Sequence, residues 1–395
     1  MSMPNALIAL GGAFIAAGLL ARMGRRIGLP TIPFFMAAGI LTGPHTPGLV
    51  LVRDPDDLGL FAAVGLIMLL FHLGLEFSLG DLTAGGATLL RAGGTYLVLN
   101  IGGGLAFGFL LGWGTKEAFV IAGAVGISSS AIVTKLLVEL ERLANPETGM
   151  ILGIIVVEDV FLALYLALLQ PILGQAEGAA ESAIQFGRAF GFLVLLLGVA
   201  RFGAKAVGRF LSSDDDELLT ILFVGFAVMV SGVAEEFGVS EAIGALLAGL
   251  IVAETKAAPR IEHLVLPLRD AFAAVFFFAF GLTIDPGDVS SVALPVTAAV
   301  ILSLLLNIVA GIVGARLYGL GRRAAANAGL TLLGRGEFSL ILAGFGVAAG
   351  LDGRIAPFVA LYVLVLAVIG PFLATSSDHL SRRLPRRIFE KGVSK

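Results

Sequence analysis

The sequence predicts an all-α polytopic membrane protein with 13 transmembrane helices, an N-terminus outside and a C-terminus inside. Three observations predict this fold class: the composition, the long apolar runs and the positions of the basic residues. Of 395 residues, 57% are hydrophobic and 14% are charged, whereas about 25% are charged in ordinary soluble proteins. The mean hydropathy is +0.98. A soluble core of this size cannot bury so much apolar surface, and the composition disfavours a disordered chain, a coiled coil and a nucleic-acid-binding protein.

The apolar runs give the helices one by one. A helix needs about 20 apolar residues to cross a bilayer. The candidate runs are 5–21, 30–44, 58–77, 89–113, 117–141, 147–170, 184–211, 216–237, 239–254, 264–283, 292–318, 324–350 and 355–374. The second and the ninth are short. The fifth is interrupted at Ser128 to Ser130, and the twelfth at Gly334 to Glu337.

The basic residues test this count, because cytoplasmic loops are enriched in Lys and Arg. With 13 spans and an outer N-terminus, 21 of the 26 basic residues fall on the inner side. Arg335 lies within a span, and the four on the outer side are Arg53, Lys116, Arg188 and Arg354. A wrong count would scramble this alternation, so the sequence predicts a multi-pass protein of the cell membrane, with the lipid bilayer as its surroundings.

An internal repeat relates the two halves of the chain. Residues 70–82, at the end of the third span, align with 277–289, at the end of the tenth, at an offset of 207. The short second and ninth spans align at an offset of 210, and the two interrupted spans at a similar one. Each pair is seven spans apart, so the halves have opposite orientations, which is typical of an inverted repeat. The expected organisation is one transmembrane transporter domain (1–395), with a first repeat (5–170), a linker helix (184–211), a second repeat (216–374) and a short basic cytoplasmic tail (375–395).

Inverted repeats with broken helices at corresponding places are typical of secondary transporters. In such proteins the breaks cross near the middle of the membrane. Unwound carbonyl groups and helix ends then face the transported ion. The fifth and twelfth spans are the broken helices that the sequence predicts here.

Two adjacent acids, Glu158 and Asp159, lie near the middle of the sixth span, where charges are costly and often functional. Neighbouring helix residues point about 100° apart, so one carboxylate can face the crossing while the other meets a partner elsewhere. A carboxylate in a wet, partly desolvated cavity can bind either a proton or a monovalent cation, which is the simplest chemistry of antiport. The alternative is an ion pair that holds helices together, and it applies more readily to Glu158 than to Asp159.

Further polar residues lie at the fifth-span break and in the eleventh span. Ser128, Ser129 and Ser130 offer oxygen ligands that suit an alkali cation, or they are small residues that let helices approach closely. Asn307 lies in the middle of the eleventh span. It either stands near the ion or joins two helices by a hydrogen bond.

The twelfth-span break contains two charged residues, Arg335 and Glu337. Because Arg335 cannot be neutralised, it needs a carboxylate partner, and the candidates are Glu158 and Glu337. A structural bridge and a role in transport are equally open for this pair. His72, deep in the third span, is more typical of a group that packs helices together than of a proton carrier.

The cysteine and histidine content argues against a metal site, and the arrangement of the acids argues against an enzyme. The chain has no cysteine and four scattered histidines, so it offers no thiolate nucleophile and no clustered zinc ligands. We therefore expect no cofactor. An intramembrane aspartyl protease needs two carboxylates that face each other from different helices, whereas Glu158 and Asp159 are adjacent, so the chain is not expected to be an enzyme. A channel-like efflux pathway and a non-transporting sensor stay open as other classes.

In combination, several segments resemble the Kef/Kht branch of the monovalent cation:proton antiporter family, and the resemblance covers essentially the whole chain. The segments that carry it are 126–133, 145–148, 153–159, 241–247, 276–282 and 335–339. It implies a sodium/proton-antiporter-like fold and K⁺ efflux in exchange for H⁺ in a bacterial membrane. Asp159 would be the carboxylate shared by proton and cation, and Ser129 and Ser130 would complete the cation site.

The resemblance also implies a homodimer in which a core domain moves like an elevator against a dimerisation domain. Many relatives in the wider superfamily have a Lys or Arg where this chain has Asn307, so the resemblance does not extend to a mechanism that uses a basic residue in that span. Kef-type relatives have Gln at the position of Glu158. They also continue into a cytosolic nucleotide-binding domain. For this chain, the similarity to the Kht system implies instead a separate soluble regulatory subunit on the cytoplasmic face. Na⁺/H⁺ exchange and a ligand-gated, Kef-like potassium efflux pathway are the alternatives, and Na⁺ or Rb⁺ are possible cations beside K⁺.

Overall fold

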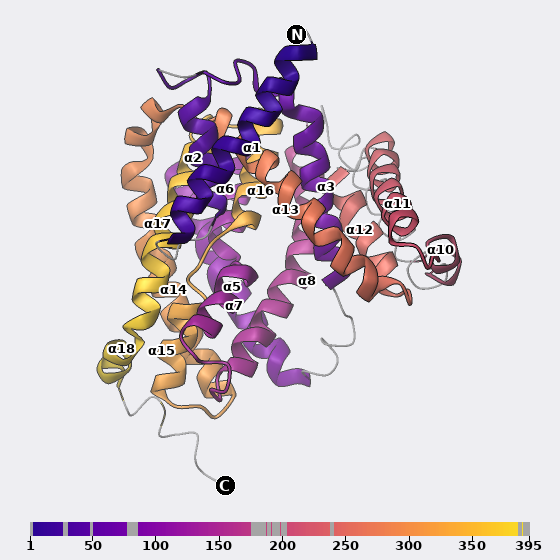
Figure 1. Ribbon diagram of the computed structural model, residues 1–395. Helices are drawn as coiled ribbons and strands as arrows, with labels where there is room; N and C mark the ends of the chain where they lie inside the picture. Colours follow the sequence, from indigo (N-terminus) through magenta and orange to yellow (C-terminus); the bar gives the residue numbers. More distant parts are fainter. Residues whose placement is uncertain are drawn as a thin grey trace. The chain divides into compact units, whose positions relative to one another are not determined.

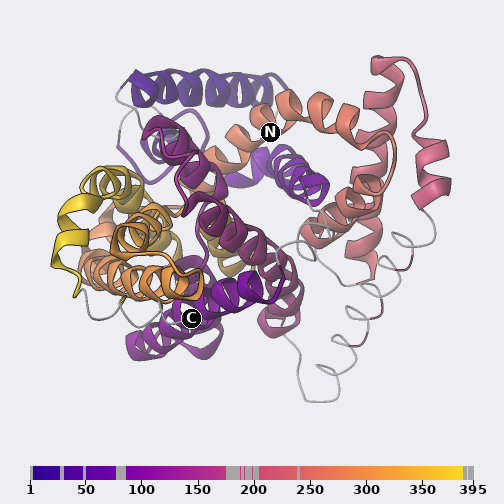
Figure 2. The ribbon, with the colours of Figure 1, turned by 90° about the horizontal axis from the view of Figure 1, so that it is seen from below.

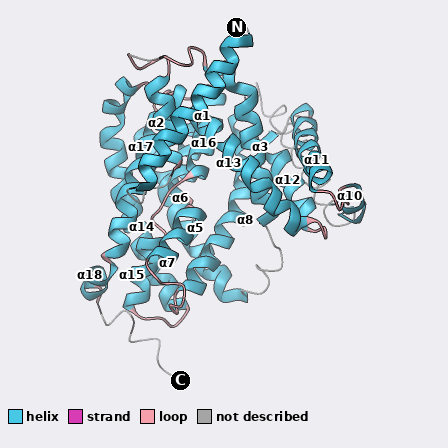
Figure 3. Ribbon diagram, viewed as in Figure 1, coloured by secondary structure: helices cyan, strands magenta, loops and turns pink. Residues whose placement is uncertain are grey.

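The computed structural model is helical in all the regular secondary structure that it describes (Figure 3). It describes residues 3–26, 31–47, 50–76, 86–174, 187, 191, 198, 204–237, 241–385 and 389. Most of the predicted linker helix 184–211 lies outside these residues. Of that range, the structure describes residues 204–211, which include helix α10 (Ala204–Phe210), and the three single residues 187, 191 and 198.

Eight of the described helices are long and apolar enough to cross a membrane. They are α1 (Met3–Arg26), α3 (Gly59–Glu76), α5 (Gly86–Leu111), α8 (Thr148–Leu173), α11 (Asp216–Glu236), α13 (Ala258–Leu282), α14 (Val289–Leu317) and α17 (Ile355–Thr375). The two short predicted spans correspond to the short apolar helices α2 (Ile32–Thr42) and α12 (Glu241–Ala253). A short helix, α18 (Ser377–Arg383), follows α17.

Two predicted spans each consist of two helices. The fifth is divided into α6 (Thr115–Gly126) and α7 (Ser130–Glu139), and the twelfth into α15 (Arg322–Thr331) and α16 (Glu337–Ala348). Both breaks fall where the polar and glycine-rich clusters predict them. The total of 13 spans and their orientation stay predictions.

The chain divides into two compact units. Unit 1 contains Met1–Arg22, Phe34–Ser78 and Ala163–Thr283, and unit 2 contains Met23–Pro33, Leu79–Leu162 and Ile284–Lys395.

In unit 1, α3 packs against α12 and α13, and α11 packs against α12 (Figure 1 and Figure 2). The helices touch through backbone. A side chain at Gly74 of α3 would collide with the backbone of Leu246 and Gly249 on α12. A side chain at Gly281 of α13 would collide with the backbone of Met36 on α2. Glycine is therefore required at both contacts, because only backbone without a Cβ can approach so closely.

These two glycine contacts correspond under the repeat that the sequence predicts. Gly74 aligns with Gly281, and Gly249 aligns with Gly39. A Cβ built on Gly249 would meet the carbonyl oxygen of Phe71, and one built on Gly39 would meet the carbonyl oxygen of Phe278. In each predicted repeat, a glycine of a long helix, Gly74 of α3 or Gly281 of α13, thus contacts the short helix of the other repeat, α12 or α2.

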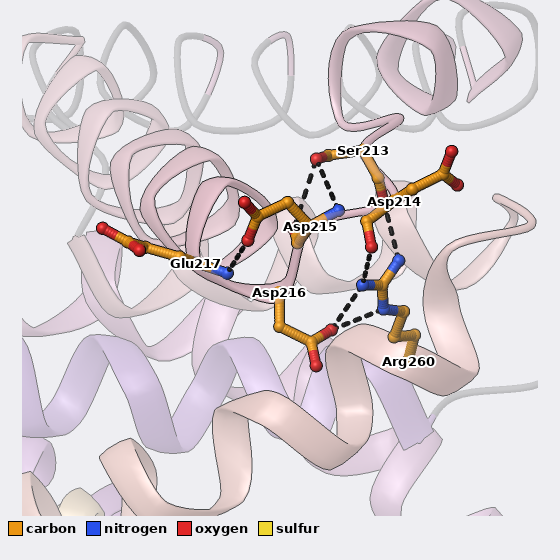
Figure 4. A network of polar contacts seen from close by, with 6 residues as sticks. All are labelled: Ser213, Asp214, Asp215, Asp216, Glu217 and Arg260. Atoms are coloured by element: carbon orange, nitrogen blue, oxygen red, sulfur yellow. Dashed lines mark hydrogen bonds and ion pairs between the residues drawn. The ribbon is translucent and has the colours of Figure 1, made fainter.

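Arg260, near the start of α13, closes the turn before α11 (Figure 4). It donates to the carbonyl oxygens of Ser213 and Asp214, both at 2.7 Å, and pairs with the Asp216 carboxylate. The Asp215 carboxylate accepts the backbone N–H of Glu217 and caps the helix. The acidic run therefore fixes the start of α11 against the start of α13.

In unit 2, α14 packs against α5, α15 and α17, and α6 packs against α5 and α16. A buried apolar cluster joins α5, α7, α8, α14 and α15; among its members are Ala92, Val133, Ile151, Ala310 and Ala328. This packing holds the two broken helices, and with them the candidate site, between continuous ones.

Candidate ion site at two broken helices

The two broken helices meet at their breaks in unit 2. The backbone N–H of Ser129, between α6 and α7, donates to the carbonyl oxygen of Gly334, between α15 and α16, over 3.0 Å. A side chain at Gly336 would clash with the Ser129 hydroxyl, so this glycine lets the two breaks approach. Helices α6 and α15 end here, and α7 and α16 begin here. Two partly negative and two partly positive helix ends therefore lie at one place, which is the arrangement that suits an ion.

Glu158 holds the first break, between α6 and α7, in an extended conformation. The second break is the one between α15 and α16. Glu158 stands on α8 with no exposed surface, and its two carboxylate oxygens accept from Ser128. The backbone N–H donates to Oε1 at 2.8 Å, and the hydroxyl donates to Oε2 at 2.6 Å. A carboxylate buried in this way is tolerable because its oxygens are bonded. The Ser128 hydroxyl, predicted as a cation ligand, is in this structure bonded to Glu158.

Asp159 follows Glu158 on α8 and is half-buried. Since consecutive helix residues differ in direction by about 100°, the two acids present their carboxylates to different surroundings at the level of the break. The other predicted ligands flank the break: Ser129 is buried and Ser130, the first residue of α7, is half-buried. That these groups bind one cation together stays a prediction.

Arg335 lies fully buried in the second break. Its guanidinium donates to backbone carbonyls: to Val125 and to Leu332, each at 2.8 Å, and to Gly334 at 3.4 Å. These carbonyls belong to the ends of α6 and α15, whose dipoles are negative there. The sequence suggests a carboxylate partner for Arg335, whereas these hydrogen bonds go to helix ends that exist only because the helices are broken. Glu337 is the half-buried first residue of α16.

Asn307 belongs to a buried network that joins α5, α14 and the second break. Its amide nitrogen donates to Asn100 Oδ1 at 3.2 Å and to the Ser303 carbonyl at 2.8 Å. Its own Oδ1 accepts from the Tyr96 hydroxyl at 2.9 Å. Tyr96 also lies 3.3 Å from the carbonyl oxygen of Leu332, at the end of α15. Asn307 therefore joins helices, and it does so next to the break.

Tyr96 and Asn100 are residues that our sequence reasoning missed. Both are fully buried polar groups in α5. One signal could have found Asn100: it precedes Asn307 by 207 positions, the same offset that relates the third span to the tenth.

His72, in unit 1, faces Arg269 of α13. The guanidinium Nη1 lies 3.2 Å from the His72 Nδ1 atom. An arginine can only donate, so the ring nitrogen that it meets must be unprotonated. This contact joins α3 to α13, as expected for a group that packs helices.

Comparisons with known proteins agree with this geometry. Residues 12–375 match the family described as "Sodium/hydrogen exchanger, transmembrane". The "K(+)/H(+) antiporter subunit KhtU" of Bacillus subtilis is 40% identical over 388 residues, which cover 97% of this chain and 96% of that protein. The "Ammonium/H(+) antiporter subunit AmhT" of Alkalihalophilus pseudofirmus is 31% identical, over 89% of this chain and 88% of that protein. The "Na(+)/H(+)-K(+) antiporter GerN" of Bacillus cereus is 26% identical, over 86% and 87%.

Among solved structures, the sodium proton antiporter MjNhaP1 from Methanocaldococcus jannaschii has a TM-score of 0.71 and covers 97% of this chain and 99% of its own. Its identity is 17%, so this likeness shows the fold alone. The relatives are named as antiporters, which confirms the predictions of a transporter and of the Kef/Kht resemblance. The match to the family over most of the chain, together with 40% identity to a relative aligned over almost its whole length, shows that this chain is a multi-pass membrane protein of the sodium/hydrogen exchanger family.

Proposed function

We propose that this chain is a secondary active K⁺/H⁺ antiporter that moves K⁺ outward in exchange for protons, with Asp159 as the carboxylate that both ions share. The family and its named relatives support cation/proton antiport in general. The observation that carries the proposal is the crossing in unit 2. There two breaks are joined by the Ser129 to Gly334 hydrogen bond, beside a pair of acids in the middle of a membrane span.

Glu158 and Asp159 would have different roles, one structural and one in ion binding. Glu158 has both oxygens engaged by Ser128, so it holds the break. Asp159 is half-buried, a setting in which one carboxylate can release a proton to take up a cation and release the cation to take up a proton. Ser129 and Ser130 would add oxygen ligands, which suit an alkali cation. The partly positive starts of α7 and α16 would offset the negative charge of the carboxylate while it is empty.

The contacts of the charged loops support the proposed topology of 13 spans. Residues predicted on the same side of the membrane bond to one another within each unit. In unit 1, Arg260 bonds to Asp214 and Asp216, all expected inside. In unit 2, Asp352 bonds through its backbone N–H to Glu117, both expected outside. An odd error in the number of spans between two such residues would put them on opposite sides.

K⁺ is preferred over Na⁺ because the K⁺/H⁺ antiporter subunit is the relative with 40% identity. Na⁺/H⁺ exchange is the second candidate, since the GerN relative is named for Na⁺ as well as K⁺ and oxygen ligands alone do not separate the two ions. A ligand-gated, Kef-like efflux pathway is the third. It differs from the others because its flux would follow the K⁺ gradient without obligatory proton exchange.

We further propose a homodimer that works by an elevator-type movement and binds a separate soluble regulatory subunit. The division into two compact units, with all residues of the crossing in unit 2, agrees with a core domain and a dimerisation domain. The word "subunit" in the names of two relatives supports a further component.

The test is exchange in proteoliposomes that contain the purified chain and a trapped pH dye. Addition of K⁺ to vesicles with an acidic interior should raise the internal pH, and Na⁺, Rb⁺, Li⁺ and NH₄⁺ should be compared at equal concentration. A response to Na⁺ larger than that to K⁺ would replace the proposal by Na⁺/H⁺ exchange. Rapid K⁺ flux that moves no protons would favour the channel-like pathway, and no response to any cation would contradict antiport.

A further inference from the structure

A row of buried polar side chains follows one face of α15 toward the crossing. Asn327 and Thr331 are four residues apart and therefore share a helix face, and Arg335 comes four residues later, in the break. They are exposed by 2%, 0% and 0% respectively. Each has one polar atom without a hydrogen-bond partner: Asn327 Oδ1, Thr331 Oγ1 and Arg335 Nη2. They are three of the four such side-chain atoms in the described residues.

A buried acid stands at the far end of this row. Glu147, just before α8, is 4% exposed, and its Oε1 accepts hydrogen bonds from the amides of Asn145 and Asn327. Arg142, whose side chain carries the fourth unpartnered atom, interacts electrostatically with the same carboxylate. Both residues belong to the loop that the charge pattern puts on the cytoplasmic side. The row therefore leads from a cytoplasmic loop to the crossing.

Leaving buried polar atoms unbonded is costly, so native proteins satisfy them with ordered water. The three side chains suit a chain of water molecules, because Asn327 Oδ1 accepts, the Thr331 hydroxyl both donates and accepts, and the Arg335 N–H donates. Asn327 and Thr331 are about one helix turn, ~6 Å, apart along the axis, and Arg335 lies four residues further along the chain, beyond the end of α15, so a few waters can bridge the row. Glu147 and Glu158 then stand at the two ends.

From this arrangement we propose that Glu147, Asn327 and Thr331 form a hydrated proton path inside unit 2, which connects the cytoplasmic side with the carboxylates at the crossing. The path is distinct from the route of the cation. It deepens the proposed antiport function and rests on it. Protons pass along hydrogen-bonded water, whereas K⁺ would need several oxygen ligands to replace its hydration shell. Among the described residues of the row, the fully buried unbonded oxygens are Asn327 Oδ1 and Thr331 Oγ1, which is too few for that.

Arg335 does not close this path to protons. A fixed arginine can repel protons in a narrow pore, but this one is bonded to the carbonyl ends of α6 and α15, each equivalent to about −0.5 charge. Glu158 also interacts electrostatically with Arg335. The positive charge of the Arg335 guanidinium is therefore offset by the groups around it, and it does not repel protons from the path.

The first test detects water without relying on transport. Because the chain contains no cysteine, Thr331→Cys introduces a single thiol in a side chain of similar size. Ag⁺, a small ion that binds thiols through water-filled routes, should block this thiol at least about tenfold faster than the thiol of Leu330→Cys, since Leu330 packs in an apolar cluster and apolar voids stay dry. Blocking is measured as loss of maleimide labelling after denaturation. Equal, slow reaction of both thiols in folded protein would overturn the hydrated path.

The second test separates protons from cations. Thr331→Val keeps the shape of the side chain but removes its hydroxyl, so K⁺-driven proton movement in proteoliposomes should fall about tenfold or more. Exchange of Rb⁺ for K⁺, which needs no proton, should stay within about twofold, and Thr331→Ser should restore proton movement. Thr297→Val is the matched control, because the Thr297 hydroxyl bonds only within its own helix.

Two outcomes of this second test also overturn the proposal, and one overturns the function on which it rests. Proton movement by Thr331→Val at the wild-type rate would show that the hydroxyl carries no protons. An equal loss of both exchanges in a folded variant would show a structural role. Wild-type protein that moves no protons with any cation would contradict antiport itself, whereas the Ag⁺ reaction would still decide whether the path holds water.

Discussion

Asn307 donates a hydrogen bond to Asn100 over 3.2 Å, and the two asparagines are 207 positions apart. Each also donates to the carbonyl oxygen four residues before it: Asn100 to Tyr96, and Asn307 to Ser303. The offset is the one that aligns the third span with the tenth. Corresponding residues of the two proposed repeats therefore bond to each other, as expected for residues beside an axis of internal symmetry.

Asn307→Leu is expected to destabilise unit 2. It removes one of the two acceptors of the Tyr96 hydroxyl and the donor to Asn100 Oδ1. Interhelical hydrogen bonds of this kind are worth about 0.6 kcal/mol on average and up to about 1.7 kcal/mol. Thermal unfolding in detergent measures the effect. In a double-mutant cycle with Asn100→Leu, the two losses should be less than additive. Additive losses would mean that the pair is not coupled in the folded protein.

Glu158→Gln should fold normally, whereas Glu158→Leu should not. A glutamine can accept the Ser128 N–H with its oxygen and donate to the Ser128 hydroxyl with its nitrogen, so both contacts with the break are kept. Leucine leaves a buried N–H without a partner, which costs about 1–3 kcal/mol. The melting temperatures of the two variants in detergent check this. A glutamine variant as unstable as the leucine variant would show that the charge, rather than the hydrogen bonding, holds the break.

Gly74→Ala and Gly281→Ala should each destabilise the protein by a similar amount, about 1–3 kcal/mol. In both, the added methyl meets backbone of a neighbouring helix, α12 or α2, and backbone cannot move aside without repacking. Gly232→Ala is the matched control, because a Cβ there meets nothing within 4 Å. Unfolding of the three variants is compared under one condition. A cost for only one of the two glycines would contradict the equivalence of the repeats in unit 1.

Asp352 should make a small, pH-dependent contribution to stability. The Arg354 guanidinium bonds its carboxylate at 2.6 Å and holds the pKa of Asp352 below its ordinary value of 3.8. The contribution is therefore complete above that ordinary value and is lost as the pH falls through the lower pKa of the folded state. Because the pair is partly exposed, it should stay below about 1 kcal/mol.

The measurement is a comparison of wild type with Asp352→Asn in thermal unfolding at several pH values. The difference should be largest near neutral pH and disappear in acid. A difference that grows as the pH falls would have the wrong sign for a lowered pKa and would refute this assignment.

Much of the fold follows from the sequence, because the bilayer imposes strong rules on length and charge. The short helices α2 and α12, and the breaks at Ser128 to Ser130 and at Gly334 to Glu337, are visible as short or interrupted apolar runs. The repeat is visible as well, because glycines at close backbone contacts, such as Gly74 and Gly281, cannot be exchanged for larger residues without a collision.

The partners of the buried polar groups are harder to predict. Arg335 bonds to carbonyls that are free only because α6 and α15 end there, and no sequence pattern marks a backbone acceptor. Asn327 and Glu147 lie 180 positions apart, and each alone is an ordinary polar residue near a helix end. Tyr96 lies in an apolar helix, where a single polar residue carries no indication of what it meets, and Asn100 is marked only by its offset of 207 from Asn307.

The central claim is that one carboxylate, that of Asp159, takes up the proton and the cation in turn. The measurement that tests it most directly is K⁺-driven proton movement in proteoliposomes containing wild type or Asp159→Asn, with Glu158→Gln as the neighbouring control and a melting curve to show that each variant folds. The account predicts that wild type raises the internal pH when K⁺ is added and that folded Asp159→Asn does not. Proton movement by Asp159→Asn at the wild-type rate would contradict it.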